Sequence, residues 1–359
     1  MAPAGEGGIP RSGILLRVRH VMGRETKVAF MKQILLTGAV GQIGSELAMA
    51  LRERYGADRV VATDIRMPSD KTLRDSGPFE FLDVTDPNHI TRVMQIYDIE
   101  TVYHLAAVLS ATGETRPNVA WQVNMTGLYN MLEAARQYKC SLFFPSSIGA
   151  FGKNTPKDNT PQDTIQRPDT MYGVTKVAGE LLCDYYHKRF GLDTRGVRFP
   201  GLISYVAEPG GGTTDYAVEI FYQAIKHKRY TCYLDRDTYL DMMYMPDALR
   251  AMINLMEADG ARLIHRNAFN ITAMNFTPDQ LAAEIKKHIS EFTIDYEVDP
   301  VRQEIADSWP NYMDDSAARE EWGWEPKYTI GNMTADMLEK LSSRSGSTEE
   351  ETATSSKSD

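Results

Sequence analysis

The chain has 359 residues, of which 42% are hydrophobic, and a formal net charge of −10. This length can form one large domain or two smaller ones, and the acidic balance argues against nucleic acid or an anionic membrane as the main partner. No run of 18 apolar residues occurs, so we expect no membrane-spanning helix. The three cysteines lie far apart and the seven histidines lack metal-ligand spacing, so we expect neither a disulfide framework nor a metal site.

Residues 1–30 form a basic leader, with four Arg and one Lys against two Glu. The stretch "ILLRVRHVM" has the pattern of a short basic amphipathic helix, which resembles a mitochondrial transit peptide more than a secretory signal. We therefore expect a mitochondrial protein. The alternatives are a disordered leader without a targeting role and a cytoplasmic location.

Residues 31–200 alternate short apolar runs with longer helical patterns. Strands are expected at 33–37, 59–63, 79–84, 101–107, 141–147 and 194–201. Short apolar strands separated by helices are typical of a parallel sheet covered on both faces. Because such crossovers are right-handed, the pattern predicts an α/β fold with a doubly wound, Rossmann-like parallel sheet.

Residues 201–341 are more irregular and are expected to form a smaller mixed α/β lobe for the substrate, with some return to the sheet. Helices are indicated by "YAVEIFYQAIKH" and "MPDALRAMINLMEA", and "FNIT" at 269–272 is read as a short strand. Thr277, Pro278 and Gln280 form the signature of a capped helix start. Residues 342–359 are polar and of low complexity, which predicts a disordered tail.

The first expected strand ends in "TGAVGQIG", residues 37–44. Glycines at this spacing allow a tight turn and a close approach of the backbone to a pyrophosphate, and the helix that follows offers free N–H groups to the phosphates. The motif lies in a βαβ unit, as dinucleotide binding requires. The residues assigned to this turn are Gly38, Gly41, Gln42, Ile43 and Gly44.

Asp64 ends the second expected strand, twenty residues after Gly44. A carboxylate there can accept both hydroxyls of the adenosine ribose and would repel a 2′-phosphate, so the expected cofactor is NAD rather than NADP. Other strand ends are expected to border the adenine or to let the cofactor pass. The further residues assigned to the cofactor are Asp83, Val84, Leu105, Ala106, Ala107 and Ile203.

Tyr172 and Lys176 lie one helical turn apart, so both side chains project from one face. Their helix follows the fifth strand, which ends in Ser146 and Ser147, at the sheet edge where ligands bind in this architecture. A tyrosine has a pKa near 10, and a neighbouring ammonium favours its phenolate form. With Ser147 holding the reacting oxygen, these are the groups needed to remove a proton from an alcohol while hydride leaves for NAD⁺.

These motifs, with "HLAA" at 104–107, "SSIGAFG" at 146–152 and "YGVTK" at 172–176, resemble the extended short-chain dehydrogenase/reductase superfamily over residues 32 to about 340. Within it, "RPDTMYGVTK" and "PGGGTTDYAVEIF" closely resemble the short-chain-type L-threonine dehydrogenases. The resemblance implies oxidation of the L-threonine β-hydroxyl by NAD⁺ to 2-amino-3-ketobutyrate. That product loses CO₂ to give aminoacetone, or a 2-amino-3-ketobutyrate CoA ligase cleaves it to glycine and acetyl-CoA.

The same resemblance implies roles for individual residues. The family's base falls on Tyr172 and its lysine on Lys176, and Ser147 stands where the family often has threonine. Trp309 would close over the substrate, with ordinary packing as the alternative. The remaining residues assigned to the substrate are Ser110, Ser146, Thr213 and Thr214. A homodimer joined through helices 117–138 and 170–189 is also expected.

Two other functions remain open at this stage. A nucleotide-sugar epimerase or dehydratase would use the same tyrosine and lysine. Such enzymes usually have asparagine after the sixth strand, where this chain has Pro200. A non-catalytic NAD-sensing protein would bind partners instead, and such proteins often lack the Tyr–Lys pair that is present here.

Overall fold

The computed structural model describes residues 33–206 and 212–355, with side chains described as far as residue 344. Within this part of the chain, every helix is too short or too polar to cross a membrane. The same residues contain no group of three or more His, Cys, Asp or Glu placed to hold a metal ion. The basic leader at residues 1–30 lies outside the described residues.

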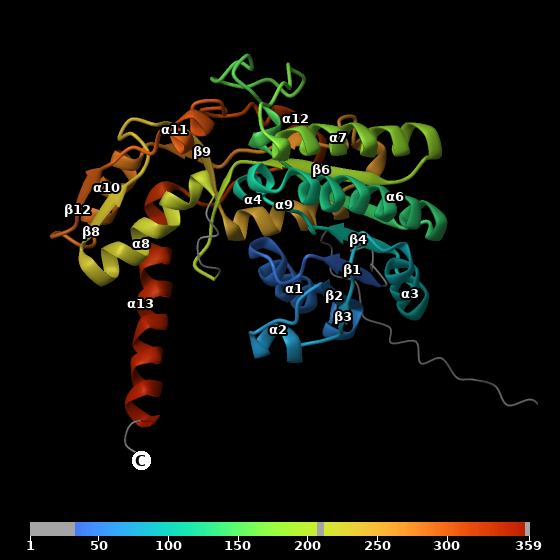
Figure 1. Cartoon of the computed structure of the whole chain (residues 1–359), viewed down its shortest axis with the longest axis horizontal. Helices are drawn as coiled ribbons and strands as arrows, with labels where there is room; N and C mark the ends of the chain where they lie inside the picture. The colour runs from blue at the N-terminus through green and yellow to red at the C-terminus, as the bar shows by residue number, and fades with distance from the viewer. Residues whose placement is uncertain (1–32, 207–211, 356–359) are drawn as a thin grey trace, which may run out of the picture.

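A seven-stranded parallel sheet forms the larger lobe, in the order β10-β6-β5-β4-β1-β2-β3 (Figure 1). The chain leaves β1 for β2 and β3 on one side and later returns to β4, β5 and β6 on the other. This is the predicted doubly wound arrangement, with its switch point between β1 and β4. The strands are β1 (Ile34–Thr37), β2 (Val60–Asp64), β3 (Phe79–Phe81), β4 (Thr101–His104), β5 (Ser141–Ser147), β6 (Thr194–Phe199) and β10 (Phe269–Asn270).

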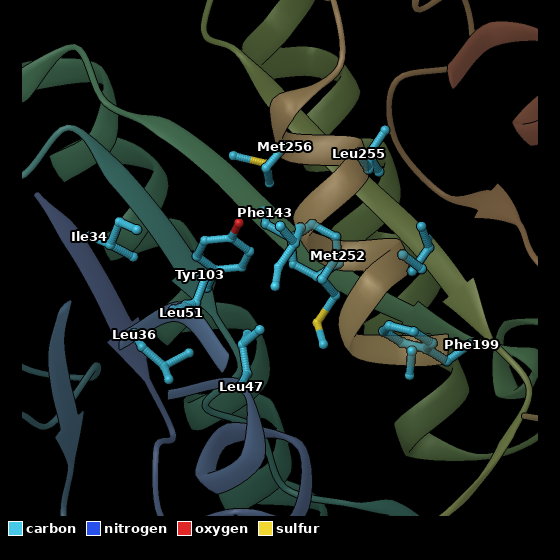
Figure 2. Close-up of a cluster of buried hydrophobic side chains, with 14 of the residues drawn as sticks. Ile34, Leu36, Leu47, Leu51, Tyr103, Phe143, Phe199, Met252, Leu255 and Met256 are labelled. Carbon is cyan, nitrogen blue, oxygen red and sulfur yellow. The ribbon is translucent and has the colours of Figure 1, made fainter. Parts of the chain in front are cut away.

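Apolar side chains alternate between the two faces of the sheet, because successive residues of a strand point to opposite sides. Ile34 and Leu36 pack into a core with α1 (Gln42–Tyr55) and α9 (Met245–Glu257). Leu35 packs into the opposite core, with α3 (Pro87–Tyr97), α6 (Gly127–Tyr138) and α7 (Met171–Phe190). Figure 2 shows the first core, where residues of α9 meet the sheet. Its labelled members include Leu47, Tyr103, Phe143, Met252 and Met256.

Several strands are shorter than the sequence predicts. The apolar run 194–201 is divided at Pro200 into β6 and β7 (Gly201–Ile203), because proline has no N–H to donate to a strand ladder. The chain also leaves the sheet after His104, so residues 105–107 are not strand. Because these strands end early, the residues that follow them lie outside the sheet, at the edge where a ligand would bind.

The smaller lobe lies beside the sheet, at the left of Figure 1. It contains a three-stranded sheet, β11-β9-β7, and a parallel pair, β12-β8. The capping box of Thr277 and Gln280 at the start of α10 is confirmed. The remaining strands and main helices of the lobe are β8 (Arg229–Cys232), β9 (Leu240–Tyr244), β11 (Met274–Phe276), β12 (Thr293–Tyr296), α8 (Tyr216–His227), α10 (Pro278–Lys286), α11 (Pro300–Ala306) and α13 (Ile330–Ser355).

The final helix differs from the expected disordered tail. Helix α13 runs to Ser355 and extends away from the rest of the molecule in Figure 1. Its first turns are anchored by Met333 and Met337, which are fully buried in the lobe core. Adding a residue to an existing helix is much easier than starting one, so a packed first half allows the polar second half to continue as helix.

Candidate active site

The glycine-rich turn between β1 and α1 has no room for side chains at two positions. A Cβ at Gly44 would lie 2.1 Å from the Gly38 carbonyl oxygen, and Gly38 has a φ of +71°. Gly41 is the residue before the first turn of α1, where no side chain caps the helix. The first N–H groups of α1 therefore face the ligand edge without a capping side chain. This geometry fits the pyrophosphate of a dinucleotide.

Asp64 ends β2 as predicted, and its carboxylate is connected to the glycine turn. Oδ2 accepts a hydrogen bond from the Val40 N–H at 3.0 Å, and Oδ1 accepts one from the Arg66 N–H at 3.1 Å. A carboxylate offers about four acceptor positions, so these two bonds leave capacity for ribose hydroxyls. Asp64 thus both aligns the turn and presents an acceptor beside it.

The other residues assigned to the cofactor lie at neighbouring strand ends, with one exception. Asp83 accepts hydrogen bonds from the N–H and hydroxyl of Thr85, while Val84 is buried. Leu105, Ala106 and Ala107 follow β4 and are half-buried. Ile203 is instead fully buried in the core of the smaller lobe.

Helix α7, which carries Tyr172 and Lys176, begins at the candidate site. Thr170 caps it by accepting a hydrogen bond from the Gly173 N–H at 3.1 Å, which fixes the turn that carries Tyr172. A Cβ on Gly149, just beyond β5, would lie 3.1 Å from the Tyr172 ring. The Tyr172 ring therefore lies against Gly149, where an added side chain would push the ring by a few tenths of an ångström.

Lys176 is buried beneath Tyr172. Its Nζ donates a hydrogen bond to the Pro145 carbonyl at 2.7 Å and lies 5.3 Å from the centre of the Tyr172 ring. A small cavity adjoins it, lined by His104, Ala106, Ala107, Asn124, Phe144, Thr175 and Lys176. The predicted pair is thus brought together at the edge of the sheet.

The charges of this pair differ from the sequence-based expectation. Burial lowers the pKa of Lys176 to about 8. Burial also raises the pKa of Tyr172, with a hydrogen bond to Ser147 acting in the opposite direction. Desolvation of the phenolate is the largest effect on this tyrosine, so its pKa lies above the ordinary value in spite of the Ser147 hydrogen bond.

The two serines at the end of β5 have different surroundings. Ser147 Oγ accepts a hydrogen bond from the Gly149 N–H at 3.1 Å and contacts Tyr172. Ser146 points to the other side of the strand, where its hydroxyl donates to the buried carboxylate of Glu180. Glu180 in turn pairs with Arg198 at 2.9 Å. Ser146 is therefore a member of a buried polar network, whereas Ser147 faces the tyrosine.

Asn124 was not among the residues assigned from the sequence. It lies in a five-residue π-helical segment, Gln122–Thr126, that interrupts the expected helix 117–138. Its amide accepts from the Val108 N–H at 2.7 Å, and donates to the Val108 carbonyl at 3.1 Å and the Thr175 hydroxyl at 3.0 Å. An asparagine between two apolar residues of an expected helix was the available signal, and Asn130 of the same helix shares it.

The residues assigned to the substrate are distributed over both lobes. Ser110 begins a short helix, α4 (Ser110–Thr115), whose Gly113 approaches the backbone of Tyr172. Thr213 and Thr214 begin a short 3₁₀ segment that ends at Asp215. Trp309 is buried in the core of the smaller lobe, which favours the packing alternative.

The register of β5 and β6 relates Thr214 to Ser147. Ser147 is aligned with Phe199, so Gly201 follows two residues later at the start of β7. A Cβ on Gly201 would lie 2.7 Å from the Thr214 methyl carbon. Thr214 therefore lies close to the strand that continues from the edge where Ser147 lies.

Comparison with known proteins gives consistent matches over most of the chain. Residues 34–271 match the NAD dependent epimerase/dehydratase family. An uncharacterized epimerase/dehydratase of Staphylococcus haemolyticus is 58% identical over 311 residues, covering 87% of this chain and 98% of that protein. The curated relative carries no established substrate.

Two solved structures are also similar. L-threonine dehydrogenase from Clostridium difficile is 59% identical, with a TM-score of 0.86 and coverage of 88% of this chain and 98% of that one. The holo form of a GalE-like L-threonine dehydrogenase from Cupriavidus necator is 50% identical, with a TM-score of 0.83 and coverage of 86% and 99%.

The expectation of a mitochondrial protein is wrong. Close relatives come from Staphylococcus and Clostridium, bacteria that have no mitochondria. A basic amphipathic pattern also arises in leaders without a targeting role, so the pattern alone could not decide the compartment.

The family match over residues 34–271 is independent of that leader. With the glycine turn, Asp64 and the Tyr–Lys pair in place, the chain belongs to the NAD dependent epimerase/dehydratase family of extended short-chain dehydrogenase/reductases, with NAD as its cofactor.

Proposed function

We propose that the protein oxidises the β-hydroxyl of L-threonine to the ketone of 2-amino-3-ketobutyrate, with NAD⁺ as the oxidant. The observation that carries the proposal is the placement of Tyr172, Ser147 and Lys176 at one sheet edge, in a chain 59% identical to a solved L-threonine dehydrogenase. NAD⁺, when bound, accepts the hydride released from the carbon that bears the hydroxyl. The chain's own residues manage the proton and the orientation.

Each of the three residues has one task in this proposal. Tyr172 Oη removes the hydroxyl proton, and Ser147 Oγ hydrogen-bonds the reacting oxygen so that it stays beside the tyrosine. Lys176 holds a positive charge beneath the ring, 5.3 Å from its centre, which favours the phenolate as it forms.

Binding of the amino acid is assigned to both lobes. The hydroxyls of Ser110 and Thr214 are proposed to contact its charged ends, with Thr213 supporting them through its backbone. The Thr213 carbonyl already accepts a hydrogen bond from the Tyr233 hydroxyl at 3.3 Å. Trp309 is proposed to act only indirectly, through the packing of the lobe.

A direct assay tests the function. Purified protein is mixed with L-threonine and NAD⁺, and NADH is followed by its absorbance at 340 nm. L-serine, which has the hydroxyl but lacks the methyl group, serves as the comparison substrate. Absence of NADH formation with L-threonine, together with conversion of a nucleotide sugar by the same preparation, would replace the proposal with the epimerase or dehydratase alternative that the family name allows.

The pH dependence of this reaction follows from the two pKa shifts. The active form needs a phenolate on Tyr172, whose pKa is raised, and an ammonium on Lys176, whose pKa is about 8. Below about pH 8 the lysine stays charged, and kcat/KM should rise about tenfold per pH unit as the phenolate forms. Above that value, loss of the ammonium should offset the gain. A rise of the same slope from pH 7 to pH 10 would contradict this reading.

We also propose that the protein is a homodimer. Val174, Leu181 and Tyr185 of α7 are 42%, 63% and 53% exposed, and their spacing places them on one side of the helix. Leu181→Arg should give a monomer in light scattering, because it places a charge in the apolar contact. Ile264→Arg changes a residue that is 82% exposed and lies outside these helices, so it should leave the mass unchanged. A monomeric unmodified protein would contradict the proposal.

A further inference from the structure

A hydrogen bond joins the two lobes behind the glycine-rich turn. Glu46 lies on α1, two residues after Gly44, and its Oε1 accepts a hydrogen bond of 2.5 Å from the hydroxyl of Ser204. Ser204 follows β7 directly and is fully buried. Its oxygen also accepts a hydrogen bond from the Val206 N–H at 3.0 Å. The end of β7 is thereby attached to the helix that begins at the dinucleotide turn.

The same segment is held from its other side by the last helix. Arg344 of α13 donates from Nη1 to the carbonyls of Tyr205 and Val206, the latter at 3.2 Å. Burial raises the pKa of Glu46, whereas its bond with Ser204 and the charge of Arg344 act in the opposite direction. A half-buried carboxylate costs desolvation energy that an apolar residue would not. The Glu46 carboxylate is therefore explained by its hydrogen bond with Ser204 and not by packing alone.

Strand β7 connects this contact to the threonine side of the site. Gly201 begins the strand and lies against the Thr214 methyl group, and Ser204 follows its last residue. The strand is paired in parallel with β9, where Gly201 is aligned with Met242 and Ile203 with Tyr244. Because β7 has only three residues and each of them is paired with β9, we expect a shift at one end to reach the other.

We infer that Glu46 is a positioning residue that couples the dinucleotide helix α1 to the amino-acid side of the site through Ser204, β7 and Thr214. The inference rests on the proposed function, because it assigns Thr214 to the amino acid. Every contact in the path lies within residues that the structure describes. Coupling of this kind appears as a change in the affinity of one ligand when the other is bound.

The test measures that change directly. NADH affinity is determined by its fluorescence with and without saturating L-threonine, a pair of ligands that cannot react because the cofactor is already reduced. In the unmodified protein, L-threonine should tighten NADH binding by about 5-fold or more. In Ser204→Ala and Glu46→Ala, the ratio of the NADH affinities with and without L-threonine should fall towards one. NADH affinity without L-threonine should change much less.

Two further variants separate positioning from general stability. Glu46→Gln keeps an oxygen that can accept from Ser204, so it should retain most of the coupling. Glu53→Ala removes an exposed carboxylate from the same helix and should retain all of it. Full coupling in both Glu46→Ala and Ser204→Ala would overturn the inference. If one of these variants does not fold, full coupling in the other would overturn it.

The inference and the proposed function fail in different ways. If L-threonine is oxidised but does not alter NADH affinity in the unmodified protein, the coupling is absent and the function stands. If no NADH forms from L-threonine and NAD⁺, the proposed substrate is wrong, whatever the variants show. The two results come from separate measurements, turnover at 340 nm and equilibrium fluorescence.

Discussion

Tyr172→Phe should lower kcat for threonine oxidation by about 10²–10⁴-fold, the range typical for loss of a general base. The substitution keeps the ring, which lies against Gly149 and above Lys176, and removes only the oxygen that takes the proton. NADH should still bind, because the glycine turn and Asp64 are unchanged. Stopped assays for kcat and fluorescence titration for NADH measure the two effects separately.

A second tyrosine on the same helix provides the control. Tyr185 is 53% exposed and lies more than three turns from Tyr172 along α7. Tyr185→Phe makes the same chemical change away from the reacting groups, so kcat should remain near that of the unmodified protein. Equal activity of the two variants would remove Tyr172 from the mechanism.

Gly44→Ala should reduce NAD affinity by about 10²-fold. The new Cβ would lie 2.1 Å from the Gly38 carbonyl oxygen and 2.8 Å from the Ala39 Cα, so backbone has to move. Overpacking costs about 1–3 kcal/mol even where side chains can yield, and about 1.4 kcal/mol corresponds to tenfold in affinity. Because the displaced atoms form the phosphate-binding turn, most of the cost should appear in binding.

Gly331→Ala is the matched control for this change. Gly331 also lies in a helix, α13, and the nearest atom to its added Cβ is 3.6 Å away. Alanine is a better helix residue than glycine, but Gly331 lies in the first turn of α13, so the melting temperature should stay the same or rise slightly while NAD affinity is unchanged. Calorimetric titration and thermal unfolding cover both variants. NAD affinity of Gly44→Ala within a factor of two of the unmodified protein would show that the turn adapts.

The order of strands and the ligand edge were predictable because their signals are local. Each strand of the parallel sheet is a short apolar run, and the glycine turn follows the first of them, so fold and cofactor site could be placed from residues near in sequence. Asp64, Tyr172 and Lys176 were found in the same way, from their distance to a strand end or to each other.

Features that depend on contacts between distant segments were not predictable. The π-helical turn at Asn124 is held by the Val108 backbone and Thr175, neither of which helical periodicity reveals. Ser146 and Ser147 lie on opposite faces of β5, and the sequence does not show that the first bonds to Glu180 whereas the second contacts Tyr172, both on α7. The choice between packing and substrate contact for Trp309 could not be made from the sequence, because its neighbours come from throughout the smaller lobe.

Strand β10 comes much later in the sequence than the other strands of its sheet, and this has a consequence for folding during protein synthesis. The buried side chain of Asn270 accepts a hydrogen bond from Arg198 at 3.0 Å and donates one to the Thr160 carbonyl, so these partners stay incomplete until residue 270 has been translated. The core of the smaller lobe is completed later still, because it includes Met333 and Met337. A nascent chain therefore exposes apolar surface until it is nearly finished, and release from the ribosome, rather than completion of the first 200 residues, marks the point at which either lobe can close.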